Sequence, residues 1–150
     1  NADVRDSIEL ATRFIFRLLE EGNVKLKFRD DVKMKIAYHT PCHMEKLGWA
    51  YYSIALLRSI PNINLTVLNS QCCGIAGTYG FKKENYETSQ GIGASLFRQI
   101  EEVAADFVAT DCETCKWQIE MSTSAKVKHP ISILAEALDL EATRKLNSDK

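Results

Sequence analysis

Short apolar segments alternate with longer helical ones along this chain, and that alternation most constrains its fold. Strands are expected at residues 34–40, 63–69, 105–110 and, more briefly, 126–128. Helices are expected at residues 3–21, 46–60, 83–103, 112–122 and 131–140. Strand and helix in alternation indicate an α/β fold, with a mainly parallel sheet of about four strands flanked by helices.

Several details of these helices follow from local residues. Gly22 is placed to end the first helix in a left-handed conformation. Helix 46–60 is apolar on nearly all sides, which predicts burial in the core. An interruption near Gly91 and Gly93 is considered for the next helix, and the polar tail after residue 141 is expected to fray.

The five cysteines follow the ends of the expected strands. Cys42 comes after the first strand, Cys72 and Cys73 after the second, and Cys112 after the third. Because ligands bind beyond the carboxyl ends of the strands in open α/β sheets, these loops are expected to meet at one edge. Cys115 lies one helical turn beyond Cys112, so its sulfur is expected on the same side.

This clustering favours a metal centre built by Cys42, Cys72, Cys73, Cys112 and Cys115. An odd number of cysteines cannot form a fully paired disulfide framework within one chain. Adjacent cysteines reach one small zinc ion only with strain, whereas each can bind a different iron of an iron–sulfur cluster. Structural zinc bound by four of the five, a redox-active Cys112-x-x-Cys115 pair, and inert buried thiols remain alternatives.

Residues beside the cysteines are expected to have supporting roles. Glycines 74, 77 and 80 are expected to let backbone amides approach cluster sulfur. Asp111 is expected to cap the helix that follows it, and Trp117 to pack in the core. His39 and His43 flank Cys42, and they are interpreted as a strand-end residue and a nearby donor or surface group rather than as ligands.

Composition limits the functions that remain. The chain has 150 residues and a net charge of −1, so it lacks the basic surplus of a general nucleic-acid binder. No uncharged apolar run is long enough for a transmembrane helix. The chain opens with Asn-Ala-Asp rather than Met, and we expect it to be part of a longer protein. No hydroxyl nucleophile or acid–base pair is evident, so substrate turnover is expected to belong to other subunits.

Three segments resemble the cysteine-rich CCG domain family, namely residues 39–46, 71–86 and 110–123. They contain Pro41-Cys42-His43, Cys72-Cys73-Gly74 and Cys112-x-x-Cys115, and the resemblance spans residues 34–140. The family includes the B subunit of heterodisulfide reductase, the iron–sulfur subunit of glycolate oxidase and the C subunit of anaerobic glycerol-3-phosphate dehydrogenase; these segments are most similar to the last. The gaps of 29 and 38 residues between cysteine groups differ slightly from the usual spacing.

The resemblance implies an electron-transfer role. Residues 1–150 would be a single CCG domain of a longer iron–sulfur subunit, beside a sibling CCG domain and a ferredoxin-type domain. Packing of helix 46–60 on that sibling domain or on the membrane surface would then be alternatives to its burial in the core. The five cysteines would hold a [4Fe–4S] cluster, cubane or noncubane, with zinc as the alternative. Electrons from flavin-bearing catalytic subunits would pass toward menaquinone. The complex would contact the cytoplasmic face of the inner membrane peripherally.

Overall fold

The computed structural model describes residues 8–148, and its centre is a four-stranded parallel sheet. The strands are β1 (Met34–Tyr38), β2 (Ile63–Val67), β3 (Phe107–Ala109) and β4 (Val127–Lys128). Their spatial order is β2-β1-β3-β4, and every pairing is parallel. All four expected strands are confirmed. From β1 the chain continues to β2 on one side of it and then crosses to β3 on the other side. The strand order therefore reverses at β1, and α/β sheets bind ligands at such a point.

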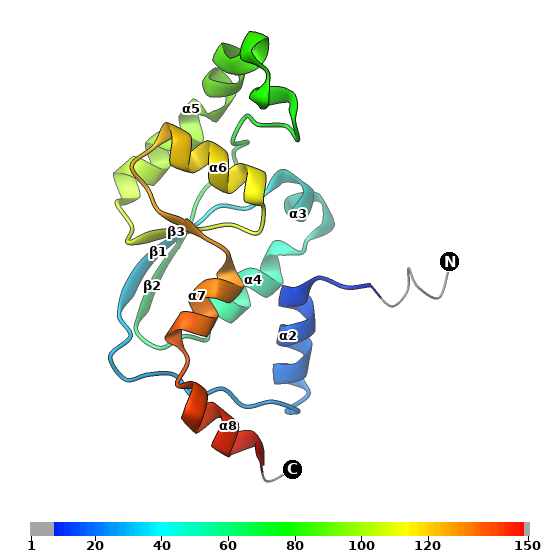
Figure 1. Cartoon of the computed structure of the whole chain (residues 1–150), viewed down its shortest axis with the longest axis vertical. Helices are drawn as coiled ribbons and strands as arrows, with labels where there is room; N and C mark the ends of the chain where they lie inside the picture. Colours follow the sequence, from blue (N-terminus) through cyan, green and yellow to red (C-terminus); the bar gives the residue numbers. More distant parts are fainter. Residues whose placement is uncertain (1–7, 149–150) are drawn as a thin grey trace.

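Helices cover both faces of this sheet (Figure 1). On one face lie α5 (Tyr86–Val103) and α6 (Glu113–Ser122), and on the other lie α4 (Ala50–Arg58) and α7 (Pro130–Ala137). The sequence of β1 explains both cores, because neighbouring side chains of a strand point to opposite faces. Ala37 packs under α5 and α6, whereas Ile36 and Tyr38 pack under α4 and α7.

The expected helix 46–60 is wrong as one continuous element. The chain instead forms α3 (Cys42–Leu47) and then α4, separated by Gly48 in a left-handed conformation at φ 67°. Gly48 ends α3 with an amide hydrogen bond to the carbonyl of Glu45, and such a left-handed end is a common helix stop. Leu56 and Leu57 on α4 are buried, whereas Tyr51 is 61% exposed, so α4 is buried on one side only.

Both ends of the chain also differ from expectation. The first described helix is α2 (Ala11–Glu20); the expected start at residue 3 lies outside the described residues, and residues 8–10 are not helical. Gly22 follows α2 with φ 68°, as expected. The tail expected to fray forms α8 (Leu140–Ser148). Asn147 explains this, because its side chain bonds the backbone of Lys25 at both N–H and C=O.

The remaining helical segments lie between β2 and β3. Two 3₁₀ turns, η1 (Tyr79–Phe81) and η2 (Lys83–Asn85), lead into α5. The considered interruption of this helix is wrong, because α5 runs unbroken through Gly91 and Gly93. Close packing, described below, accounts for the glycine at position 93.

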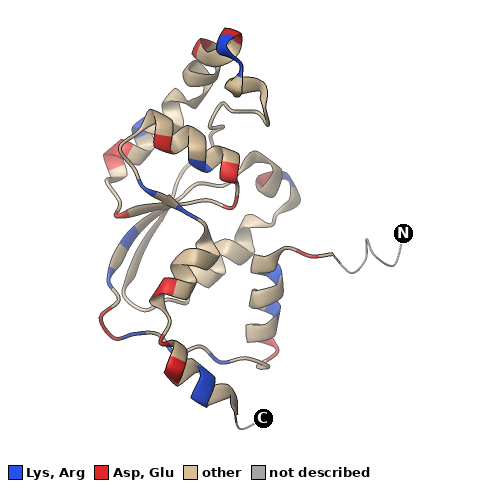
Figure 2. Ribbon diagram, viewed as in Figure 1, with Lys and Arg blue, Asp and Glu red and all other residues tan. Residues whose placement is uncertain are grey.

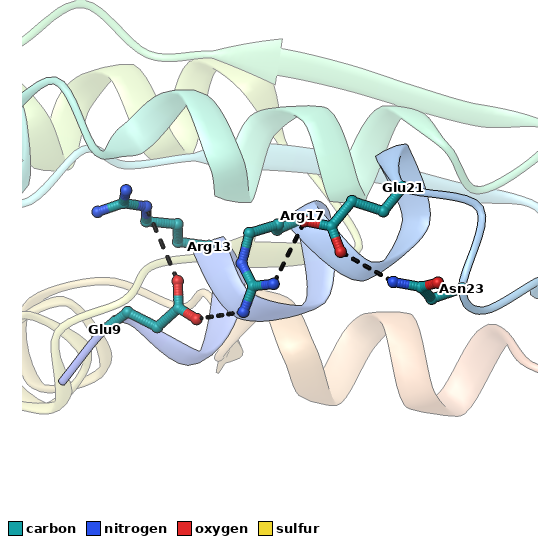
Figure 3. A network of polar contacts seen from close by, with 5 residues as sticks. All are labelled: Glu9, Arg13, Arg17, Glu21 and Asn23. Carbon is teal, nitrogen blue, oxygen red and sulfur yellow. Dashed lines mark hydrogen bonds and ion pairs between the residues drawn. The ribbon is translucent and has the colours of Figure 1, made fainter. Parts of the chain in front are cut away.

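Charged side chains are mixed over the surface. Figure 2 shows Lys and Arg interspersed with Asp and Glu in this view. On α2, Arg17 bridges Glu9 at 2.8 Å and Glu21 at 3.3 Å, and Glu21 accepts from Asn23 (Figure 3). These pairs are solvent-exposed, so each contributes at most about 1 kcal/mol. Within residues 8–148, no helix combines the length and apolar character needed to cross a membrane.

Candidate metal centre

A single cavity of about 140 Å³ brings together all five cysteines. It lies at the carboxyl ends of β1, β2 and β3, where the sequence places them. Its lining consists of the five thiols, two histidines and small neighbours: His39, Cys42, His43, Cys72, Cys73, Ile75, Ala76, Gly77, Cys112, Thr114 and Cys115. The expected convergence of the cysteines is therefore present in the fold, and their role as ligands stays a prediction.

The five thiols form an inner pair and an outer rim. Cys73 and Cys115 are buried, and their Sγ atoms lie 3.3 Å apart. Cys42 and Cys72 are exposed, and Cys112 is half-buried. A group held here would contact the protein interior on one side and approach the surface on the other, which suits exchange with a docked partner.

The start of α6 presents two of these thiols. Cys112 is the residue before the helix, in extended backbone conformation, and its Sγ lies 3.2 Å from the hydroxyl oxygen of Thr114. Asp111 was expected to cap this helix, and that expectation is wrong. Its carboxylate turns away and accepts hydrogen bonds from Tyr38 and Ser53, both at 2.6 Å.

Gly74 fits the Cys72-Cys73 loop tightly against α5. It adopts φ 89°, and a Cβ there would lie 2.0 Å from the carbonyl oxygen of Ser89. Its amide donates to Cys72 Sγ at 3.3 Å, while the expected approach of backbone amides to cluster sulfur stays a prediction. The buried Ser89 hydroxyl donates to the carbonyl of Gly74 and accepts from Gln118 of α6, so both helices fix the loop.

Interactions among the thiols separate their acidities. A hydrogen bond with Cys115 lowers the pKa of Cys112 to about 4, and the same neighbour lowers the pKa of Cys73 to about 5. The pKa of Cys115 is raised in return, because it keeps its proton between two thiolates. Burial raises the pKa of Cys72. The site therefore holds thiolate, the form that binds metal, at neutral pH.

His39 is the residue that sequence reasoning undervalued. It is 2% exposed, and among the described residues its Nε2 has no hydrogen-bond partner. A ligand atom of His39 lies within 4.8 Å of those of both Cys73 and Cys115. The useful signal was its position directly after β1, where the strand order reverses. Trp117, expected in the core, is instead 51% exposed and faces Phe81 with ring centroids 6.0 Å apart.

Asp111 joins a second cluster behind the cysteine loop. Its carboxylate lies 3.8 Å from Nε2 of His129, whose Nδ1 accepts from the amide of Ile131. Burial, followed by the Asp111 charge, raises the pKa of Tyr38. Ser53 is fully buried, and its hydroxyl donates to Asp111 rather than to the imidazole of His129. This arrangement does not place an imidazole base on the serine hydroxyl, as activation of a serine nucleophile requires. The cluster holds the end of β3 against β1 and α4.

The cavity fits a sulfur-ligated group of several atoms. One water occupies about 30 Å³ of liquid, and an engineered apolar cavity of about 150 Å³ admits benzene, so 140 Å³ exceeds the needs of a lone ion. Thiolates favour soft metals and iron–sulfur clusters. The unpartnered nitrogen of His39 adds a further donor aimed at the same region. The sulfur-rich donor set and the volume fit an iron–sulfur cluster.

Comparison with known proteins agrees with this cysteine pattern. The C subunit of anaerobic glycerol-3-phosphate dehydrogenase from Escherichia coli (strain K12) is 66% identical over 92% of this chain and 34% of its own length. An uncharacterized iron–sulfur protein of Methanocaldococcus jannaschii is 32% identical over 80% of the chain and 22% of its own length. D-2-hydroxyglutarate dehydrogenase of Pantoea ananatis is 32% identical over 47% of the chain and 7% of its own length.

The first of these relatives is about three times as long as the aligned region, so the chain spans about a third of it. The family model of the cysteine-rich CCG domain matches residues 36–120, which contain every cysteine, the last part of β1, and all of β2 and β3. The chain therefore belongs to the CCG family of cysteine-rich domains.

Proposed function

We propose that this chain is an iron–sulfur electron-transfer domain, with Cys42, Cys72, Cys73, Cys112 and Cys115 as the cluster ligands. The observation that carries the proposal is the convergence of all five thiols on one cavity of about 140 Å³. The 66% identity to one component of a dehydrogenase and the iron–sulfur relative support it. The proposed group is a [4Fe–4S] cluster, which supplies a one-electron carrier when bound.

The protein's own residues would bind and tune this group. Cys73 and Cys115 anchor it from the buried side, while Cys42, Cys72 and Cys112 hold it near the surface. The amide of Gly74 donates to Cys72 Sγ, and hydrogen bonds to cysteine sulfur help to set a cluster's potential. The exposed rim gives electrons a short route to a docked partner.

The similarity to this relative also suggests an assembly. We propose that residues 1–150 form one domain of a longer iron–sulfur subunit, with a sibling CCG domain and a ferredoxin-type domain. That subunit would serve an anaerobic glycerol-3-phosphate dehydrogenase complex. It would accept electrons from flavin-bearing subunits and deliver them toward menaquinone at the cytoplasmic face of the inner membrane, as a peripheral protein. The high identity to the Escherichia coli relative supports this assignment.

Structural zinc is the second candidate, and one observation favours it. His39, Cys73 and Cys115 place three ligand atoms within 4.8 Å of one another, and structural zinc sites use four nitrogen or sulfur ligands. A zinc site needs only four ligands, so it would leave some of the five cysteines without a ligand role. It would also stabilise the fold without carrying electrons.

The test is Cys73→Ser in the assembled dehydrogenase complex, with Met121→Ser on the exposed side of α6 as the control. Under the proposal, Cys73→Ser lowers the iron content and menaquinone reduction, while oxidation of glycerol 3-phosphate with a soluble dye continues. Met121→Ser leaves all three unchanged. If Cys73→Ser abolished the dye reaction in an assembled complex, the electron-carrier role would be wrong.

A further inference from the structure

His39 occupies a position that binds it firmly into the sheet. Its amide donates to the carbonyl of Ala109 at 2.9 Å, which extends the pairing of β1 with β3 by one residue. The imidazole therefore projects from the centre of the sheet edge, at the point where the strand order reverses. The backbone of His39 is thereby fixed to the sheet.

The surroundings of the imidazole are unusual for a buried polar group. The residue is 2% exposed, and Nε2 has no hydrogen-bond partner among the described residues. An unpaired buried nitrogen costs stability, and most such atoms in proteins find a partner. A ring nitrogen of His39 and the sulfurs of Cys73 and Cys115 all lie within 4.8 Å of one another. This geometry leaves room for a metal atom between them.

We propose that His39 is a metal ligand through Nε2, and that with Cys73 and Cys115 it forms a mixed nitrogen–sulfur set on the buried side of the centre. This inference rests on the proposed function for the identity of the group, an iron–sulfur cluster. The role of His39 as a donor to a bound metal follows from the geometry alone. The rim cysteines complete the coordination.

A nitrogen ligand changes the properties of the centre. Imidazole is neutral where thiolate is negative, so histidine at position 39 adds no negative charge beside the iron, whereas a cysteine ligand at that position would. Iron–sulfur centres with histidine ligands have higher reduction potentials than their all-cysteine counterparts. The potential of this centre should therefore lie above that of the same fold carrying cysteine at position 39.

The direct test needs no substitution. The chain is produced with ¹⁵N-histidine, loaded with iron and sulfide without oxygen, reduced, and studied by pulsed electron paramagnetic resonance. Ligation predicts a strong hyperfine coupling that changes with the nitrogen isotope. A cluster with full iron and sulfide content but only weak nitrogen coupling would assign His39 a hydrogen-bonding role instead, and the proposal would be wrong.

A second test examines metal binding by His39 without requiring an iron–sulfur cluster. The metal-free chain is titrated with Co²⁺ alone, comparing His39→Gln with His43→Gln, the other histidine of the same cavity. Loss of a ligand predicts at least tenfold weaker Co²⁺ binding for His39→Gln, since even partners of ligands change affinity about 10–100-fold. Equal affinities of the two variants, with equal circular dichroism spectra, would overturn the proposal.

The two tests keep the proposals distinguishable. A wild-type chain that binds no iron or sulfide would refute the electron-carrier function, and the cobalt titration would still decide the role of His39. In the loaded chain, His39→Cys is expected to retain iron and to shift the reduction potential to a more negative value. A potential unchanged by this substitution would count against ligation.

Discussion

Gly93 on α5 offers the sharpest test of how the fold holds the cysteine loop. A Cβ at this position would lie 2.6 Å from the carbonyl oxygen of Cys73 and 2.4 Å from Cζ of Phe97. Ordinary contact begins near 3.4 Å. The Cys73 backbone would therefore move by about 0.8 Å to admit a methyl group, or α5 would move outward by a similar distance.

Gly91 provides a matched control within the same helix, because a Cβ there meets nothing within 4 Å. Alanine in place of either glycine gains about 1 kcal/mol of helix propensity, so this contribution cancels between the two variants. The difference is the overpacking at position 93, about 1–3 kcal/mol. Gly91→Ala should exceed the wild type in stability, and Gly93→Ala should fall about 1–3 kcal/mol below Gly91→Ala.

Urea unfolding of the metal-free, reduced chain measures these free energies. In thermal melting, each kcal/mol of lost stability should lower the melting temperature by about 2–4 °C in a domain of this size. Iron content after anaerobic loading is the second measurement. It should fall for Gly93→Ala and stay at the wild-type value for Gly91→Ala. Equal stability and equal iron content of the two variants would refute the packing of α5 against Cys73.

Two further predictions concern neighbouring groups. Asp111→Ala should cost about 3 kcal/mol or more of unfolding free energy, because two hydrogen bonds to a charged acceptor are lost and the hydroxyl of buried Tyr38 is left unpaired. Tyr38→Phe should cost less, and the reverse order in urea unfolding would contradict the network. In the metal-free chain at pH 6, iodoacetamide should label Cys112 before Cys72. The pKa of Cys112 is lowered to about 4, so its thiolate is present at pH 6, whereas burial raises the pKa of Cys72 and keeps it protonated. Mass spectrometry of the labelled peptides shows which cysteine reacts first. Unfolding in urea should remove the preference for Cys112. Earlier labelling of Cys72 in the folded chain would contradict the prediction.

The sheet and the meeting of the cysteines could be predicted because both depend on local patterns. Apolar strands alternate with helices, and parallel strands must end at a common edge, so Cys42, Cys72 and Cys112 converge whatever the detailed packing. The inference that adjacent Cys72 and Cys73 can bind different iron atoms likewise needs only the sequence. These inferences rest on periodicity and topology alone.

The features that could not be predicted depend on contacts between distant residues. Asp111 is a good capping residue by type, yet Tyr38 and Ser53 draw its carboxylate to the other side. The tail gains a helix because Asn147 finds the backbone of Lys25, a partner 122 residues away. The position of His39 after β1 can be read from the sequence, but the burial of its ring beside two cysteines depends on contacts between separate elements.

The break within the expected helix 46–60 occurs at Gly48, a residue type that often ends helices. The apolar residues around Gly48 nevertheless favoured one continuous helix in the prediction. Gly48 is the one residue there that adopts a left-handed conformation without strain. The break turns α3 so that Cys42 begins it and lines the cavity. A misplaced helix boundary therefore concealed how the first cysteine reaches the site.

The most direct test of the central proposal is the iron, zinc and acid-labile sulfide content of the chain after purification and loading without oxygen. The proposed [4Fe–4S] cluster predicts about four iron and four sulfide per chain, with visible absorbance and negligible zinc. About one zinc per chain without sulfide would contradict the electron-carrier function and identify a structural metal domain.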